Sequence, residues 1–315
     1  MPETILICFP IARERIDSAR HEFPQFDWRE SASTDAAAVA SAAIIFGKPD
    51  PELLKHAPLL RWMQNPSAGV EAWASCDAFL RGNFTLTTAA GMHESCAQHA
   101  IALLLSLSRR IHFYDKTLQP GAWASPHFAD KPWVLSGQTM GVLGMGALGK
   151  RVCTIARALG MKTIGVNTTG TVVAEADETH AIADLDAILP RCDVLMLILP
   201  ATRETDDLID ARRLALLPKL AVLINVGRGN SIDEPALINA LKSGQLAGAG
   251  LDVFKQEPLP AHSAFFTLQN VIVSPHLGGD RPDYNERAFD IFIDNLRRFV
   301  RGERLKNCVE KSRGY

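Results

Sequence analysis

Three polar side chains of different chemistry each follow a short apolar run in the second half of the chain. They are Arg228 after Val222–Val226, Glu257 after Gly250–Val253 and His276 after Val271–Ser274. In open α/β sheets, ligands bind beyond the carboxyl ends of the parallel strands. We therefore expect a cation, a carboxylate and an imidazole to lie along one edge of a sheet.

Together these groups meet the needs of hydride transfer between a nicotinamide, which carries the hydride, and a 2-hydroxy or 2-oxo acid. An arginine can hold the substrate carboxylate through two parallel hydrogen bonds. A histidine can pass the hydroxyl proton, because its ordinary pKa of about 6.5 lies near working pH. A carboxylate on the other ring nitrogen fixes the tautomer and favours the imidazolium. We predict Arg228, Glu257 and His276 as catalytic residues, with Arg228 and His276 also binding substrate.

Each residue alone also has an ordinary structural interpretation. An arginine between glycines is usually a surface turn residue, a glutamate before proline a solvated loop residue, and a histidine after Ser-Pro a structural residue. The joint placement of all three at strand ends favours the catalytic interpretation.

A glycine turn lies upstream of these residues. Thr139–Leu143 is predicted to be a buried strand, and Gly144, Gly146 and Gly149 then form G-x-G-x-x-G before a helical pattern over Arg151–Leu159. In this context the first glycine allows a tight turn, the second lets backbone approach a pyrophosphate, and the third lets helix pack on strand. The helix N-terminus offers N–H groups to the phosphates. The pattern predicts a dinucleotide site.

The elements that must position these residues form two α/β units. Alternating strand and helix patterns over the first 90 or so residues indicate one doubly wound parallel sheet, and a second begins at Thr139. An amphipathic helix over Asn285–Val300 is expected to pack back on the first unit. We predict a flavodoxin-like substrate domain from residues 1–98 plus 284–315, and a Rossmann dinucleotide-binding domain over 99–283.

Composition excludes several classes of protein. The 315 residues carry a net charge of -2, which does not suggest a nucleic-acid partner. No apolar run approaches the ~20 residues of a membrane span, and the N-terminus lacks the basic start of a signal peptide. Six cysteines show no C-x-x-C spacing and no metal-ligand cluster, which indicates a reduced, cytoplasmic protein without a metal.

At these residues the chain resembles the D-isomer-specific 2-hydroxyacid dehydrogenase family over nearly its whole length. The matching motifs are Gly144-x-Gly146-x-x-Gly149, Leu199-Pro-Ala-Thr202-x-x-Thr205, Asn225-Val-Gly-Arg228-Gly229, Leu251-Asp252-Val-Phe-x-x-Glu257-Pro258 and Ser274-Pro-His276-x-x-Gly279.

The resemblance implies the same catalytic trio and a set of cofactor contacts. Asp252 would hold the nicotinamide carboxamide, and Pro200 and Thr202 would line the cofactor. The expected cofactor-binding residues are Gly144, Met145, Gly146, Ala147, Leu148, Gly149, Asn167, Thr168, Thr169, Leu199, Pro200, Thr202, Val226, Gly227, Asp252, Gly278 and Gly279.

The resemblance also implies a substrate loop and a homodimer. Ser67, Ala68 and Gly69 look like the family's loop whose backbone N–H groups bind the substrate carboxylate. The apolar helix from about Ala97 and the arm up to Trp133 look like its dimerisation element.

Two positions depart from the family pattern. Gln98 stands where many members carry a glutamate, which puts the ion pair of that glutamate in doubt. Asn167, Thr168 and Thr169 end the second strand of the nucleotide unit, where NAD-preferring members carry an aspartate for the adenosine ribose. No carboxylate repels a 2′-phosphate there, although no arginine is adjacent to attract one. We expect NADPH to serve at least as well as NADH, with dual use of NAD and NADP.

The sequence thus favours a reductase of small 2-oxo acids such as glyoxylate or hydroxypyruvate. One alternative is a dinucleotide-sensing regulatory protein on the same fold, like the corepressor branch of the family, which keeps the trio. Another is a 3-phosphoglycerate dehydrogenase without a regulatory domain. Relatives of formate dehydrogenase fit less well, because they carry glutamine where Glu257 stands.

Overall fold

The computed structural model describes residues 2–91, 93–117 and 132–312. Contacts divide the chain into unit 1, residues 1–92 with 281–315, and unit 2, residues 93–280. The sequence prediction placed these divisions at 98/99 and 283/284. The first of those points lies inside helix α5 (His93–Ser108), all of which belongs to unit 2.

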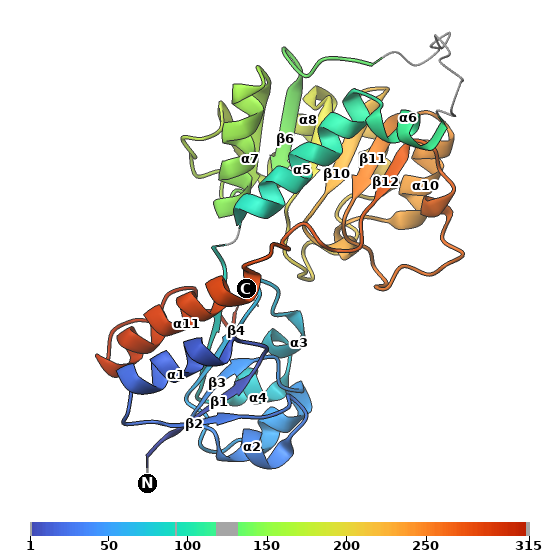
Figure 1. Ribbon diagram of the computed structural model, residues 1–315. Coiled ribbons are helices and arrows are strands. Elements are labelled where there is room, and N and C mark those ends of the chain that lie inside the picture. Colours follow the sequence, from blue (N-terminus) through green and yellow to red (C-terminus); the bar gives the residue numbers. More distant parts are fainter. Residues whose placement is uncertain (1, 92, 118–131, 313–315) are drawn as a thin grey trace. The chain divides into compact units, whose positions relative to one another are not determined.

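Unit 1 is built on a parallel five-stranded sheet with strand order β2-β1-β3-β4-β5 (Figure 1). This is the flavodoxin-like order. The strands are β1 (Thr4–Cys8), β2 (Asp27–Glu30), β3 (Ile44–Gly47), β4 (Trp62–Asn65) and β5 (Thr85–Thr88). The helices are α1 (Arg13–Glu22), α2 (Ala36–Ser41), α3 (Glu71–Ala74), α4 (Asp77–Arg81) and α11 (Tyr284–Val300), with a 3-10 helix at Pro51–His56.

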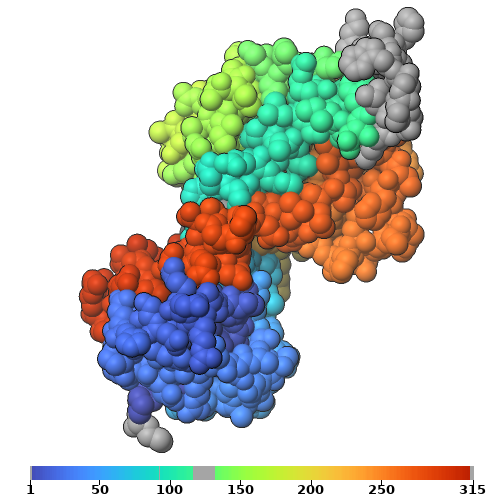
Figure 2. Space-filling view, viewed as in Figure 1, coloured from blue at the N-terminus to red at the C-terminus, as the bar shows by residue number. Residues whose placement is uncertain are grey.

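Helices cover both faces of the unit 1 sheet because its central strands are apolar on both sides. Ile5 and Ile7 of β1 face α1 and α11, whereas Leu6 between them faces α2, α3 and α4. Phe289 and Phe292 bring α11 onto this core. The C-terminal helix therefore completes the N-terminal unit, as predicted, and shares its surface with the N-terminal segment (Figure 2).

Unit 2 contains a parallel seven-stranded sheet with strand order β12-β11-β10-β9-β6-β7-β8. Counted from β6, this is the 3-2-1-4-5-6 Rossmann order with one further strand. The strands are β6 (Thr139–Leu143), β7 (Lys162–Asn167), β8 (Glu178–Ala181), β9 (Val194–Leu197), β10 (Ala221–Asn225), β11 (Leu246–Leu251) and β12 (Val271–Val273). The helices are α5 (His93–Ser108), α6 (Ile111–Thr117), α7 (Ala147–Ala158), α8 (Leu185–Ile188), α9 (Ala211–Leu216) and α10 (Glu234–Lys242), with 3-10 helices at Ile182–Asp184, Leu189–Arg191, Gly229–Ser231 and Ala264–Phe266.

The long helix α5 lies beside α7 on one face of this sheet (Figure 1). Its Ala100, Leu103 and Leu104 are buried against apolar side chains of β6, β9 and β10. Helices α8, α9 and α10 cover the opposite face. Many of the apolar side chains of α5 are therefore buried inside unit 2 itself.

The predicted fold class, two doubly wound parallel α/β domains, is confirmed. Two edge strands, β2 and β8, were not predicted, because they are short and mostly polar with exposed residues. Helix α7 begins at Ala147, earlier than the predicted Arg151, so Gly149 lies in its first turn. Most of the predicted arm up to Trp133, residues 118–131, lies outside the described residues. No helix in the described ranges is long and apolar enough to cross a membrane.

Candidate active site

The glycine turn joins β6 to α7, and its geometry requires a glycine at two of the three positions, 144 and 149. Gly144 has φ +104, and a Cβ there would lie 2.4 Å from the carbonyl oxygen of Ile198. A Cβ on Gly149 would lie 2.0 Å from the carbonyl oxygen of Gly144, so the helix can pack on the turn only without one. A Cβ on Gly146 would meet nothing within 4 Å, so that residue faces open space.

This turn fits the pyrophosphate of a dinucleotide. Gly146 is the N-cap of α7 and no side chain caps the first N–H groups of the helix. Uncapped N–H groups and the positive end of the helix dipole attract anions. Ala147 and Leu148 would contribute to this N-terminal contact, and Met145 is buried beneath the turn.

The loop after β7 is closed by the side chain of Asn167. Its Oδ1 accepts the N–H groups of Thr169 at 3.1 Å and Gly170 at 2.7 Å, and its Nδ2 donates to the carbonyl of Thr171 at 2.8 Å. The amide thus holds the loop itself. Of the three predicted residues here, Thr168 and Thr169 carry hydroxyl groups, and the hydroxyl oxygen of Thr169 lies 2.7 Å from that of Thr171 within the same loop.

Arg228 stands on a loop fixed by a buried asparagine. Asn225, fully buried at the end of β10, accepts the Gly227 N–H at 3.0 Å and donates to the Arg228 carbonyl at 3.0 Å. Both flanking glycines are needed for close approach: a Cβ on Gly227 would lie 2.6 Å from the Leu199 nitrogen, and one on Gly229 1.9 Å from the Phe254 carbonyl carbon.

The side chains of Glu257 and His276 are hydrogen-bonded to each other. Nδ1 of His276 lies 2.6 Å from Oε2 of Glu257. The other carboxylate oxygen, Oε1, accepts the backbone N–H of Phe254 at 2.9 Å, which fixes the orientation of the carboxylate. Because an ionised carboxylate only accepts hydrogen bonds, Nδ1 carries the proton. Nε2 therefore remains for a reactant, and 45% of the histidine side chain is exposed.

The loop that carries His276 is anchored on Asp252, which is 2% exposed. Oδ1 accepts the Ser274 hydroxyl at 2.6 Å and the Leu277 N–H at 3.0 Å, and Oδ2 accepts the Gly278 N–H at 2.9 Å. Burial alone would raise the pKa of Asp252, but these hydrogen bonds and one from His99 outweigh it and lower the pKa from 3.8 to about 2. The carboxylate is therefore charged at neutral pH.

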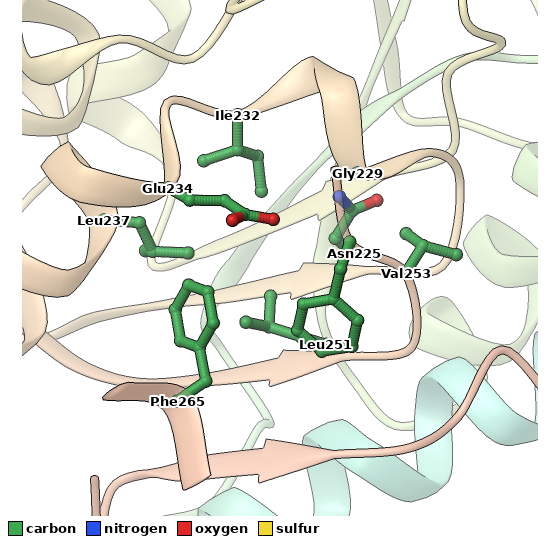
Figure 3. Close-up of a pocket in the computed structure, with 9 residues that line it drawn as sticks. Asn225, Gly229, Ile232, Glu234, Leu237, Leu251, Val253 and Phe265 are labelled. Carbon is green, nitrogen blue, oxygen red and sulfur yellow. The ribbon is translucent and has the colours of Figure 1, made fainter. Parts of the chain in front are cut away.

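Next to the Arg228 loop, lined in part by Asn225 and Gly229, lies a small cavity of about 10 Å³, enough for about one water molecule. Glu234, at the start of α10, directs its carboxylate into this cavity (Figure 3). Its Oε1 accepts the Lys255 N–H at 2.8 Å. Glu234 thereby holds the segment that leads to Glu257.

The loop Ser67–Gly69 of unit 1 is shaped by Asn65 at the end of β4. Nδ2 of this fully buried side chain donates to the carbonyls of Ser67 at 3.0 Å and Gly69 at 2.6 Å. With these carbonyls turned toward Asn65, the N–H groups of Ala68 and Gly69 have no acceptor within the described part of the chain. Such N–H groups can receive a carboxylate.

The remaining predicted residues line the same strand ends of unit 2. The loop from Leu199 through Pro200 to Thr202 is held by Thr205, whose hydroxyl donates to the Pro200 carbonyl at 2.7 Å and accepts the Thr202 N–H at 2.9 Å. Ser95 of α5 donates to the Gly279 carbonyl at 3.1 Å. Val226, 6% exposed, leads from β10 into the Arg228 loop.

Two neighbouring features bear on the chemistry. Burial raises the pKa of the Cys96 thiol to about 12, with the Asp252 charge acting in the same direction, so the thiol is neutral at physiological pH. One turn before Gln98, Glu94 accepts two hydrogen bonds from Arg151 at 2.7 and 3.0 Å. Gln98 donates to the same Glu94.

Sequence reasoning missed the residues that support the site. They are Asn65, His99, Asn225, Glu234 and Ser274. A signal was present for Asn65 and Asn225, since a neutral polar residue ending a strand whose other residues are buried must find buried partners.

A Rossmann sheet with a glycine turn, and a histidine–carboxylate pair and an arginine at its strand ends, define a nicotinamide-dependent dehydrogenase. Residues 101–278 match the family model described as "D-isomer specific 2-hydroxyacid dehydrogenase, NAD binding domain". The glyoxylate reductase of Thermococcus litoralis is 34% identical over 277 residues, covering 86% of this chain and 83% of the relative. Glyoxylate/hydroxypyruvate reductase B of Pectobacterium carotovorum is 34% identical, with 88% of each chain covered.

A solved structure of a reductase has the same fold as this chain. The NADPH-dependent glyoxylate/hydroxypyruvate reductase of Sinorhizobium meliloti, in complex with NADP and sulfate, superposes with a TM-score of 0.85 at 27% identity, covering 99% of this chain and 100% of that one. The chain belongs to the D-isomer-specific 2-hydroxyacid dehydrogenase family. It is an NAD(P)-dependent oxidoreductase of 2-oxo and 2-hydroxy acids, as predicted.

Proposed function

We propose that this protein reduces small 2-oxo acids of the glyoxylate or hydroxypyruvate type to D-2-hydroxy acids. The observation that carries the proposal is the 2.6 Å contact between His276 Nδ1 and Glu257 Oε2, on the sheet that also carries the glycine turn and Arg228. The names of the relatives support the substrate class, since they act on glyoxylate or on glyoxylate and hydroxypyruvate.

Each member of the trio has one task. A nicotinamide dinucleotide held at the glycine turn would supply the hydride. His276 gives the proton on Nε2 to the carbonyl oxygen, which completes the hydroxyl group. Glu257 keeps Nδ1 protonated and stabilises the imidazolium before transfer. Arg228 holds the substrate carboxylate through paired hydrogen bonds.

The two units would divide the binding work. Unit 2 would bind the pyrophosphate of the dinucleotide at the glycine turn. The nicotinamide end of the cofactor would contact the Leu199–Thr202 loop, Val226, Gly227, Asp252, Gly278 and Gly279. Unit 1 would receive the substrate carboxylate on the N–H groups of the Ser67–Gly69 loop, a role supported by their lack of acceptors within the described ranges.

NADPH would serve at least as well as NADH. Residues 167–174 contain no carboxylate, and Asn167 uses its amide to close the loop, so nothing in this segment repels a 2′-phosphate. Thr168 and Thr169 would supply the hydrogen bonds. Asn167→Asp should lower kcat/KM with NADPH at least about tenfold relative to NADH by like-charge repulsion. Asn167→Ala, which breaks the loop without adding charge, is the control.

The protein would act as a cytoplasmic homodimer. Ile111, the first residue of α6, is 59% exposed, and Val134, which directly follows the end of the predicted arm at Trp133, is 66% exposed. All six cysteines are unpaired, which suits a reducing compartment. Light scattering of the purified protein would test the dimer, and fractionation of cells would test the compartment.

A panel of 2-oxo acids assayed with NADH and NADPH tests the proposal. We expect turnover with glyoxylate or hydroxypyruvate, formation of the D-hydroxy acid where the product is chiral, and kcat/KM with NADPH no lower than with NADH. A tenfold or greater preference for NADH would contradict the cofactor proposal. Tight cofactor binding without turnover of any acid would contradict the reductase and indicate a dinucleotide sensor.

A further inference from the structure

His99 of α5 contacts the anchor of the His276 loop from outside the catalytic trio. Its Nε2 lies 2.8 Å from the Ser274 hydroxyl oxygen and 3.3 Å from Oδ1 of Asp252. The ring is mostly buried, with 20% of the side chain exposed. It packs so closely that a Cβ on Gly278 would lie 3.2 Å from its Cδ2.

The direction of every hydrogen bond in this cluster follows from counting protons. The Ser274 hydroxyl has one proton, and it is donated to Oδ1 of Asp252 at 2.6 Å. The hydroxyl oxygen can therefore only accept from His99, so Nε2 of His99 must carry a proton. His99 thus completes a chain of donors that ends on the buried Asp252 carboxylate.

That chain holds backbone in a conformation that is otherwise unfavourable. His276 has φ +54, a left-handed value that a residue with a side chain rarely adopts. Its N–H donates to the carbonyls of Asp252 at 2.9 Å and Ser274 at 3.1 Å, and the next two N–H groups donate to the Asp252 carboxylate. Strained backbone of this kind persists only where the surroundings over-determine it.

We propose that His99 is a positioning residue for the reaction. Acting through Ser274 and Asp252, it holds the 274–278 loop in the one conformation that presents Nε2 of His276 to the substrate. This inference rests on the proposed function, because the role of His276 comes from it.

Kinetics of matched variants test the role. His99→Ala should lower kcat by about tenfold while the KM values for acid and cofactor change by less than about threefold, because a misplaced proton donor slows chemistry more than binding. His99→Gln, whose amide nitrogen can donate from nearly the position of Nε2, should recover most of the lost rate. Gln98→Ala removes the preceding exposed side chain of the same helix and should behave as wild type.

Two kinetic results would overturn the proposal. One is a His99→Ala variant with the kcat of the wild type. The other is a His99→Gln variant as slow as His99→Ala, because the hydrogen bond would then not be the property that matters.

A double-mutant cycle tests the chain itself. If His99 acts through Ser274, the loss of kcat in His99→Ala with Ser274→Ala should be clearly smaller than the product of the two single losses. Losses that multiply would show that the two residues act independently, and would overturn the proposed route.

Hydrogen exchange provides a readout that needs no turnover. In the ligand-free protein, amide exchange in the 274–279 segment should be about tenfold faster or more in His99→Ala than in the wild type, with β6 unchanged. Unchanged exchange there would overturn the proposal. If the wild type reduces no 2-oxo acid, the proposed function fails, whereas this experiment still decides whether His99 holds the loop.

Discussion

The two units support their strand-end loops in different ways. In unit 1, the side chains of Trp62, Gln64, Thr87 and Asn295 form a fully buried network next to Asn65. None of these groups titrates. In unit 2, the neutral Asn225 amide anchors the Arg228 loop, but the His276 loop is anchored on the Asp252 carboxylate, which is charged and surrounded by donors. The Ser67–Gly69 loop of unit 1 is therefore held by neutral amides, and the His276 loop of unit 2 by a buried charge.

The difference matches what each loop presents. The Asn65 network turns backbone carbonyls inward and leaves N–H groups, which bind an anion without any change of protonation. The Asp252 network holds a histidine in strained backbone, and a buried ionised carboxylate accepts stronger hydrogen bonds than a neutral group does. We infer that the neutral network supports substrate binding, whereas the charged network supports the chemical step. Because the charged network includes a carboxylate that titrates, its contribution to stability depends on pH.

Removing Arg228 tests how much of carboxylate binding depends on charge in unit 2. Arg228→Ala should lower kcat/KM by about 10³-fold, because it deletes a charge-assisted, two-fold hydrogen bond. The assay is steady-state reduction of glyoxylate or hydroxypyruvate. A loss below tenfold would mean that the N–H groups of the Ser67–Gly69 loop suffice to bind the carboxylate.

Breaking the neutral network should affect binding more than rate. Asn65→Ala removes the side-chain donor to the carbonyls of Ser67 and Gly69, and should raise KM for the 2-oxo acid by about tenfold, with kcat within about threefold of wild type. Ser67→Ala is the matched comparison: it removes only the hydroxyl that contacts Asn65 at 3.1 Å and keeps the backbone N–H groups, so it should raise KM less than Asn65→Ala does. A fall in kcat with unchanged KM in Asn65→Ala would reverse the division of labour inferred above.

The charge of Asp252 should make the stability of the protein depend on pH. Because the folded pKa of Asp252 is lowered from 3.8 to about 2, the stabilisation is complete above the unfolded pKa and is lost as pH falls through the folded pKa. Asp252→Asn should therefore lower the free energy of unfolding by about 2 kcal/mol at pH 7, and by progressively less below pH 4.

Denaturant unfolding of Asp252→Asn, Asn65→Ala and wild type across this pH range would measure the effect. The Asn65→Ala loss should stay constant with pH, because no group in its network titrates. An Asp252→Asn loss that is equally constant would contradict a charged anchor.

The sequence predicted the chemical groups better than their supports. Arg228, Glu257 and His276 were found because parallel strands bring their carboxyl ends to one edge, a property of topology that spacing reveals. The roles of His99 and Ser274 were not predictable, because these residues lie 175 positions apart and meet only through packing of α5 on the sheet. Strands β2 and β8 were missed for a related reason: a polar edge strand is specified by its neighbour rather than by its own pattern.

The most direct test of the central claim is single-turnover reduction by His276→Ala with NADPH already bound. The account predicts that NADPH binds this variant as it binds the wild type, while the rate of 2-oxo acid reduction falls about a hundredfold or more. A single-turnover rate close to that of the wild type would contradict His276 as the proton donor.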